Sequence, residues 1–191
     1  FTNVTNEHLK HISFNSMGNE IVDINNDGLL DVFVVDMAPS NHFRSKAYMK
    51  SMNTAKFNAL AESGFHFQYM QNTLQVNNGN NTYSEIAQLS GIGKTDWSWA
   101  PLFFDMDLDG KKDLFISNGI KENFLYRDIM SEVDKKQKLL KRQLHLEELL
   151  EIVPTDISAN NAFQNIGNFK FKDVSSSCSL ILLTSLVNKF L

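Results

Sequence analysis

The chain has 191 residues, of which 42% are hydrophobic and 21% are charged, and its formal net charge is −4. This composition is that of an ordinary globular protein and excludes a disordered or membrane-embedded chain. The net charge argues against nucleic acid as the main partner, because that binding needs Lys and Arg concentrated against the phosphates. Cys178 is the only cysteine in the sequence, so no internal disulfide can form.

The first predicted elements are two short strands, residues 21–22 and 32–35, on either side of an acidic segment, residues 23–31. The composition of residues 41–63 then shifts to Lys, Met and Ala, which favour helices, and predicts a helical insertion. Residues 72–79 predict a hairpin, because apolar and polar residues alternate toward an Asn-Gly turn.

The same order of elements recurs in the second half of the chain. Strands are predicted at residues 102–104 and 114–116, around a second acidic segment at residues 105–113, and a second hairpin is predicted at residues 161–168. Between them, residues 126–152 carry Val and Leu at near-helical spacing and end just before a proline. This pattern predicts a second helical insertion.

Two sequence markers keep one register along the chain. Three five-residue segments follow one pattern, and they begin at Phe1, Tyr83 and Phe171. The pattern is an aromatic residue, a variable residue, an acid or amide, a β-branched residue and a small residue. Asp23 lies 22 residues after Phe1, and Asp105 lies 22 residues after Tyr83. An internal repeat is therefore expected. Four short antiparallel strands per repeat are typical of a propeller blade, so we predict a mainly β chain, a partial β-propeller with two α-helical insertions.

The acidic segments carry oxygen-bearing side chains at positions 1, 3, 5 and 9, and glycine at position 6. Calcium takes six to eight oxygen ligands, often including the backbone carbonyl at position 7, and the glycine permits a sharp turn. We therefore expect two Ca²⁺ sites. Their expected ligands are Asp23, Asn25, Asp27, the Leu29 carbonyl and Asp31 in the first segment, and Asp105, Asp107, Asp109, the Lys111 carbonyl and Asp113 in the second.

The flanking residues exclude an EF-hand, which requires an acidic ligand at position 12 and a helix on each side. Val34 and Ile116 stand at position 12, inside predicted strands. Without a cation, each close carboxylate pair would repel by about 1 kcal/mol in water and by ~4 kcal/mol at an effective dielectric constant of 20. Stability coupled to the metal is therefore expected. The plainer alternative is a pair of solvated acidic turns.

The D-x-[DN]-x-D-G-x-x-D pattern between strands resembles the FG-GAP/VCBS repeat of integrin α-subunit propellers and of many bacterial secreted or surface proteins. Residues 16–19, 23–36, 67–74, 96–101 and 118–119 are more closely similar to bacterial VCBS-repeat proteins related to the cartilage acidic protein and ASPIC/UnbV group. The resemblance implies a calcium-bearing β-propeller, exported to the extracellular space or cell surface. It also implies adhesion, or binding of an extracellular protein or glycan, rather than catalysis.

The resemblance and the repeat cover residues 1–175, and both fail in residues 176–191. In register, a third acidic loop would begin two residues beyond the last residue. We therefore expect the remaining blades of a longer parent chain, or a tail that is truncated or out of frame. The apolar run at residues 180–191 is shorter than the ~20 residues that a membrane-spanning helix needs.

Two further readings stay open. Residues 104–111 are close to the haloacid-dehalogenase phosphatase pattern, although Lys111 replaces its threonine, so a metal-dependent hydrolase that uses Asp107 and Asp109 is the catalytic alternative. A purely structural surface protein is the third. Trp97 and Trp99 alternate along a predicted strand, and we expect them to pack between blades rather than to stack on a sugar.

Overall fold

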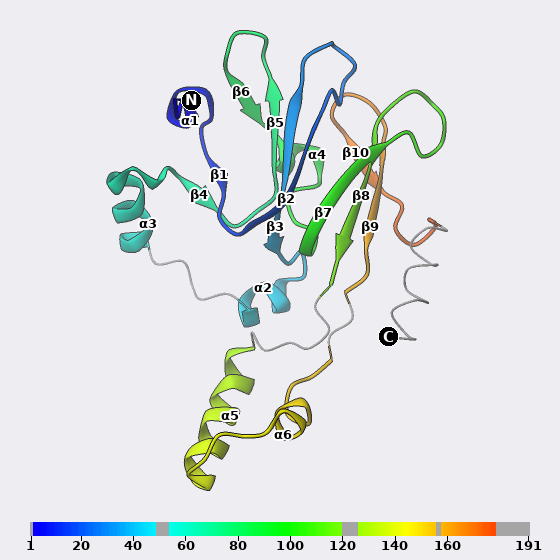
Figure 1. The fold of residues 1–191 in the computed structure, drawn as a ribbon. Helices are drawn as coiled ribbons and strands as arrows, with labels where there is room; N and C mark the ends of the chain where they lie inside the picture. Colours follow the sequence, from blue (N-terminus) through cyan, green and yellow to red (C-terminus); the bar gives the residue numbers. More distant parts are fainter. Residues whose placement is uncertain (1, 49–53, 120–125, 156–157, 179–191) are drawn as a thin grey trace.

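The computed structural model describes residues 2–48, 54–119, 126–155 and 158–178. The strands are β1 (Ile12–Ser13), β2 (Ser16–Val22), β3 (Asp31–Ala38), β4 (Gln68–Tyr69), β5 (Thr73–Asn77), β6 (Tyr83–Glu85), β7 (Asp96–Phe104), β8 (Asp113–Asn118), β9 (Asn161–Asn165) and β10 (Phe171–Asp173). One curled antiparallel sheet dominates, in the order β10-β9-β8-β7-β3-β5-β6, with β2 paired to β3 (Figure 1). The prediction of a mainly β chain is confirmed. Strands β1 and β4 form a separate parallel pair.

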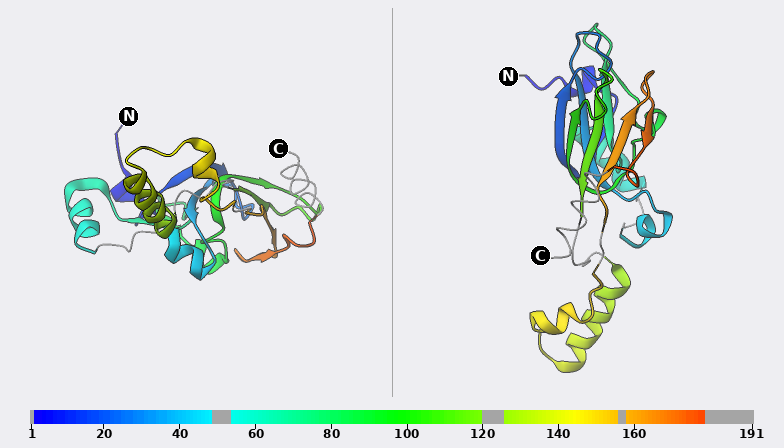
Figure 2. Two further views of the ribbon diagram at one scale, coloured as in Figure 1. Left: turned by 90° about the horizontal axis from the view of Figure 1, so that it is seen from below. Right: turned by 90° about the vertical axis from the view of Figure 1, so that its right-hand side faces the viewer.

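Helices lie in both stretches where the composition favours them. The helices are α1 (Thr5–His8), α2 (His42–Tyr48), α3 (Thr54–Leu60), a π-helical turn (Ala61–Phe65), α4 (Ala87–Ser90), α5 (Arg127–Leu140) and α6 (Leu146–Leu150). Helices α5 and α6 project beyond one end of the sheet (Figure 2). Val133, Leu144 and Val153 are buried within this projection.

The main sheet consists of two groups of four strands, which we call unit 1 (β2, β3, β5, β6) and unit 2 (β7, β8, β9, β10). Within each unit consecutive strands pair antiparallel, and the pairs match in register. In unit 1 the residue pairs include Val22 with Asp31, Val32 with Gln75, and Asn77 with Tyr83. The corresponding pairs of unit 2, in the same order, are Phe104 with Asp113, Leu114 with Phe163, and Asn165 with Phe171. Each position of unit 1 therefore has a matching position in unit 2.

The two units approach each other closely where β2 lies against β7. A Cβ added to Gly18 would lie 2.5 Å from the carbonyl oxygen of Trp99, so no larger residue fits there without a backbone shift. The Glu20 Oε2 atom accepts the Phe103 N–H across the same junction at 2.6 Å. The units are thus joined by backbone contact as well as by side chains.

One apolar core spans both units. The rings of Phe33 in β3 and Phe103 in β7 meet edge to face, with their centroids 5.5 Å apart. Burial of such side chains stabilises a fold by roughly 25 cal/mol per Å² of apolar surface. The core consists of Ile24, Phe33, Val35, Leu74, Val76, Ala87, Ile92, Phe103, Leu114, Ile116 and Phe163. Because its members come from both units, the units share one core.

The expectation that both tryptophans pack between the units is wrong for Trp99. Its side chain is 45% exposed, and its indole N–H donates to the Gly119 carbonyl at 2.6 Å. The pairing of β7 with β8 shifts register between Ser98 and Ala100, and such a bulge breaks the regular alternation of side chains. Of the atypical tail, only residues 176–178 belong to the described part, so the expectation about its remainder lies outside it.

Candidate metal centre

The two acidic loops each connect neighbouring antiparallel strands, β2 to β3 and β7 to β8, and their backbones follow the same path. Position 4 has a positive φ in both, 59° at Asn26 and 62° at Leu108. Position 6 also has a positive φ, 87° at Gly28 and 86° at Gly110, and glycine adopts this conformation without steric cost. The loops therefore curl so that their N–H groups face the aspartates.

The hydrogen bonds inside the loops match one for one. In each loop the carboxylate at position 1 accepts N–H groups from positions 5 and 6, and the carboxylate at position 5 accepts the N–H of position 7. In the first loop these bonds run from Asp27 and Gly28 to Asp23 (3.1 and 2.8 Å) and from Leu29 to Asp27 (2.8 Å). In the second they run from Asp109 and Gly110 to Asp105 (3.0 and 2.8 Å) and from Lys111 to Asp109 (2.9 Å).

Asp31, at position 9 of the first loop, is fully buried beneath it. One carboxylate oxygen accepts the Ile24 N–H at 3.1 Å, and the other accepts the Asn77 N–H at 2.9 Å. Burial raises the pKa of Asp31 above its ordinary value, these two hydrogen bonds act against that rise, and the charges of Asp27 and Asp23 add to it. A nearby cation would favour the charged form.

Asp113 is the buried counterpart in the second loop. It accepts the Met106 N–H at 2.9 Å and the Asn165 N–H at 2.7 Å. The Asn165 side chain also donates to the carbonyl oxygen of Lys112, at 3.0 Å. The end of β9 therefore holds the second loop through its buried aspartate and through its backbone.

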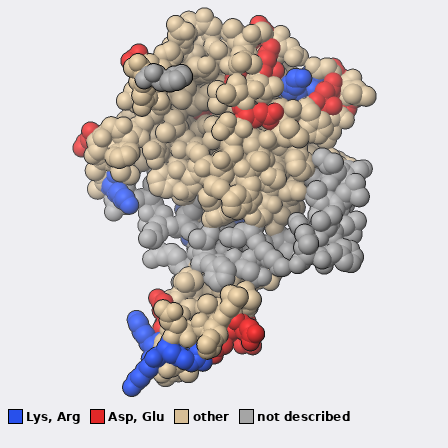
Figure 3. All heavy atoms as spheres, in the orientation of Figure 1, with Lys and Arg blue, Asp and Glu red and all other residues tan. Residues whose placement is uncertain are grey.

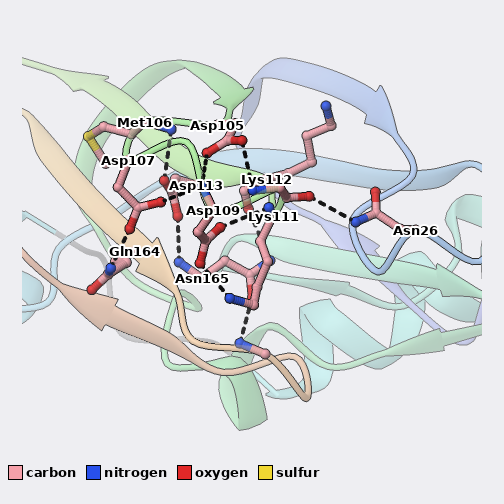
Figure 4. Close-up of polar contacts among 12 residues, drawn as sticks. Asn26, Asp105, Met106, Asp107, Asp109, Lys111, Lys112, Asp113, Gln164 and Asn165 are labelled. Atoms are coloured by element: carbon pink, nitrogen blue, oxygen red, sulfur yellow. Dashed lines mark hydrogen bonds and ion pairs between the residues drawn. The ribbon is translucent and has the colours of Figure 1, made fainter.

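Three carboxylates of the second loop converge on one space, as Figure 4 shows. Asp105, Asp107 and Asp109 each offer an oxygen, and these oxygens all lie within 4.8 Å of one another, so the triad could hold a metal ion. Asp107 accepts a hydrogen bond from the Gln164 side chain at 2.6 Å. The Lys111 ammonium group forms an ion pair with the Asp109 carboxylate. The hydrogen bond that Lys111 donates in this pair lowers the pKa of the Asp109 carboxyl.

The first loop presents two carboxylates and an amide at the matching positions. The Asn25 Nδ2 group donates to Asp27 at 2.7 Å, while its Oδ1 atom accepts the Asp27 N–H at 3.3 Å. The Asn26 side chain donates to the Gly110 carbonyl at 3.1 Å, which links the first loop to the second. Acidic side chains gather over the end of the sheet where both loops lie (Figure 3).

The predicted ligands thus fall into two groups. Positions 1, 3 and 5 lie at the exposed or half-buried mouth of each loop, whereas Asp31 and Asp113 lie beneath it. The position-7 residues Leu29 and Lys111 lie within the turn. Sequence reasoning missed Asn77 and Asn165, which hold the buried aspartates. Their matching places in the two predicted hairpins, each two residues before a glycine, could have drawn attention to them.

A scan against protein-family models and searches of curated proteins and of solved structures found no match to this chain. Within the described ranges, no helix combines the length and the apolar character that crossing a membrane requires.

Proposed function

We propose that the chain is a non-enzymatic calcium-binding repeat scaffold in which each acidic loop holds one Ca²⁺ ion. The observation that carries this proposal is the one-for-one match of hydrogen bonds in the two loops, around side chains of the same type. Asp31 and Asp113 each bind one N–H per carboxylate oxygen, which leaves a second lone pair on each oxygen for a cation.

The donor chemistry favours calcium over other divalent metals. Asp105, Asp107 and Asp109 supply hard carboxylate oxygens, and the cluster contains neither His nor Cys, which zinc prefers. Calcium accepts irregular sets of six to eight oxygens, whereas magnesium demands near-ideal octahedral geometry and keeps several waters. The irregular set of carboxylate, amide and carbonyl oxygens that these loops offer suits calcium better.

We further propose that the two units are neighbouring blades of an FG-GAP/VCBS-type β-propeller whose other blades belong to the parent chain. Four antiparallel strands per unit and matching registers support this architecture. With the sequence resemblance, it supports an exported or cell-surface protein that binds an extracellular protein or glycan through its loops and helical insertions. The loops then serve as fixed points of the scaffold.

The catalytic alternative finds less support in the second loop. The phosphatase pattern belongs to a strand followed by a helix in a βαβ layout, whereas β7 and β8 are antiparallel neighbours. Asp109, which would have to exchange a proton, pairs with Lys111 instead. This geometry favours a binding role over a catalytic one.

Calorimetric titration of the chain with calcium chloride tests the proposal. We expect two saturable sites in the native chain and one in each of Asp27→Asn and Asp109→Asn, which change the position-5 aspartate of each loop. Asp134→Asn changes an exposed carboxylate on α5 and is the matched control, with two sites expected. Absence of saturable binding, or unchanged stoichiometry in both loop variants, would refute calcium binding. Phosphoester turnover with magnesium that is lost in Asp107→Asn would favour the hydrolase instead.

A further inference from the structure

Among the predicted ligand positions, the two acidic loops differ only at positions 3 and 7. The first loop has Asn25 and Leu29 there, and the second has Asp107 and Lys111. At these two positions the second loop therefore carries one more negative charge and one more positive charge than the first. Positions 1, 5 and 9 are aspartate in both loops. The two differences thus occur together, in loops that otherwise repeat one arrangement of charged groups.

Both differences act on one oxygen atom. In the first loop the Asn25 Nδ2 group donates to Oδ2 of Asp27, the position-5 carboxylate, at 2.7 Å. An ionised aspartate has no donor, so Asp107 does not fill this role at position 3 of the second loop. There the Lys111 ammonium group donates to Oδ2 of Asp109, the matching atom (Figure 4). Each loop thus supplies a donor of its own to the same carboxylate oxygen, from a different position.

Lys111 also offsets the additional charge of the second loop. Its hydrogen bond to Asp109 raises the pKa of Lys111, and the charges of Asp107 and Asp113 add to this rise. The side chain of Lys111 is 42% exposed and that of Asp109 is 32% exposed, so water screens the pair only in part. Counted over the five ligand positions, four carboxylates and one ammonium group leave the second loop with −3, the charge that three carboxylates give the first. The lysine therefore acts on the carboxylates of the loop as a group.

We propose that Lys111 is a built-in counter-ion of the second loop, which holds Asp109 in the metal-free chain and which calcium has to displace. Only the displacement rests on the proposed function, because the counter-ion role needs no metal. A divalent ion that binds the Asp109 carboxylate competes with the ammonium group for it, and the two positive charges repel each other. Lys111 thus stabilises the empty loop and opposes its filling, so it sets the calcium affinity of the second site.

Calorimetric titration with calcium chloride tests the displacement. The Asp27→Asn background silences the first loop, so that the heat reports the second loop alone. Lys111→Leu introduces the residue type of position 7 in the first loop. It should tighten calcium binding roughly tenfold, because it removes a positive charge that repels the divalent ion. Lys112→Leu is the matched control, since it removes the same charge from the next residue, which forms no ion pair among the described residues. It should tighten binding less than about threefold, because its charge is not paired with a ligand.

Urea denaturation in chelator tests the counter-ion role. Lys111→Leu leaves Oδ2 of Asp109 without its donor among the other carboxylates, so the equilibrium constant for folding should fall by about two- to fivefold. In the Asp107→Asn background the same change should have no measurable effect, because the amide at position 3 then supplies the donor, as Asn25 does in the first loop. High salt should reduce the loss in the native background, since it screens charges that water reaches.

The two measurements distinguish this inference from the proposed function. If the Asp27→Asn chain bound no calcium, the proposed function and the displacement of Lys111 would both be wrong, while the comparison in chelator would still decide the counter-ion role. Calcium binding that Lys111→Leu tightens no more than Lys112→Leu does would overturn the inference and leave the proposed function standing. An equal loss of stability from Lys111→Leu in the native and Asp107→Asn backgrounds would overturn it as well.

Discussion

Asp31 and Asp113 have the same role in the two loops, although they lie far apart in the chain. Each buried carboxylate accepts one N–H from the second residue of its own loop and one from the asparagine that ends the third strand of its unit. The bonds from Asn77 and Asn165 measure 2.9 and 2.7 Å. The position-9 aspartates therefore brace the loops from below, whether or not an ion is bound.

This bracing predicts that the two kinds of loop aspartate differ when calcium is absent. Asp113→Ala leaves the buried N–H groups of Met106 and Asn165 without their acceptor, and it should lower the free energy of unfolding by about 2–4 kcal/mol. Asp107→Ala, at the exposed mouth of the loop, should change it little in a chelator. Urea denaturation in chelator measures both. Equal losses in the two variants would contradict the separation of bracing from ion binding.

The strained backbone at Leu108 predicts a stabilising substitution. Leu108 is 88% exposed and has a φ of 62°, a conformation that costs a non-glycine residue about 1–2 kcal/mol. Asn26 adopts the same conformation at the matching position, and asparagine tolerates it better. Leu108→Asn should therefore raise the free energy of unfolding by about 1 kcal/mol. The control is Leu139→Asn, a change of an 82% exposed residue near the end of α5, where no gain is expected. A gain no larger than that of the control would refute the strain argument.

Asp36 is a buried carboxylate away from the loops. One of its oxygens accepts the Ser13 hydroxyl at 2.6 Å and the N–H groups of Phe14 and Asn15 at 2.8 and 2.9 Å. The other oxygen is buried and has no hydrogen-bond partner among the residues that the structure describes. Burial raises the pKa of Asp36 above its ordinary value, and the hydrogen bonds to its carboxylate only partly oppose this rise.

The raised pKa of Asp36 predicts a pH dependence with a definite sign. Because the folded state holds this proton more tightly than the unfolded state, stability falls as the pH rises above 3.8 and levels off above the raised value. Asp36→Asn removes the titrating carboxyl and with it this loss of stability. The matching residue of unit 2 is Asn118, so the variant carries the same residue type at this position in both units. The stability of the variant relative to the native chain should thus increase from acid to neutral pH. Urea midpoints across that range measure it, and parallel profiles would contradict the assignment.

The parts of the structure that the sequence predicted are those held by local bonds. In the loops, Asp23 and Asp105 bind N–H groups only four and five residues ahead, so the spacing of Asp and Gly along the chain specifies the turn. The hairpin turns at residues 77–79 and 165–167 also close over two residues, because the Gly N–H donates to the side-chain oxygen of the Asn. Such patterns are readable because they need no distant partner.

Features that depend on distant partners could not be predicted in this way. The pairing of Ile12 with Gln68 joins two-residue strands across more than fifty positions. The hydrogen bond from the Asn165 N–H to Asp113 joins residues on opposite sides of a helical insertion. The exposure of Trp99 follows from a bulge in β7. Each depends on how the sheet assembles, because side-chain periodicity reports which residues share a face but not what covers that face.

Thermal unfolding of the full chain in calcium and in chelator tests the central claim most directly. One site filled at 100 times its dissociation constant adds about 2.7 kcal/mol, and for a chain of this size each kcal/mol raises the melting temperature by roughly 2–4 °C. With both sites filled, calcium should therefore raise the melting temperature of the native chain and of Asp134→Asn by about 10–20 °C. It should leave the double variant Asp27→Asn with Asp109→Asn unchanged. A native chain that melts at the same temperature in calcium and in chelator would contradict the account.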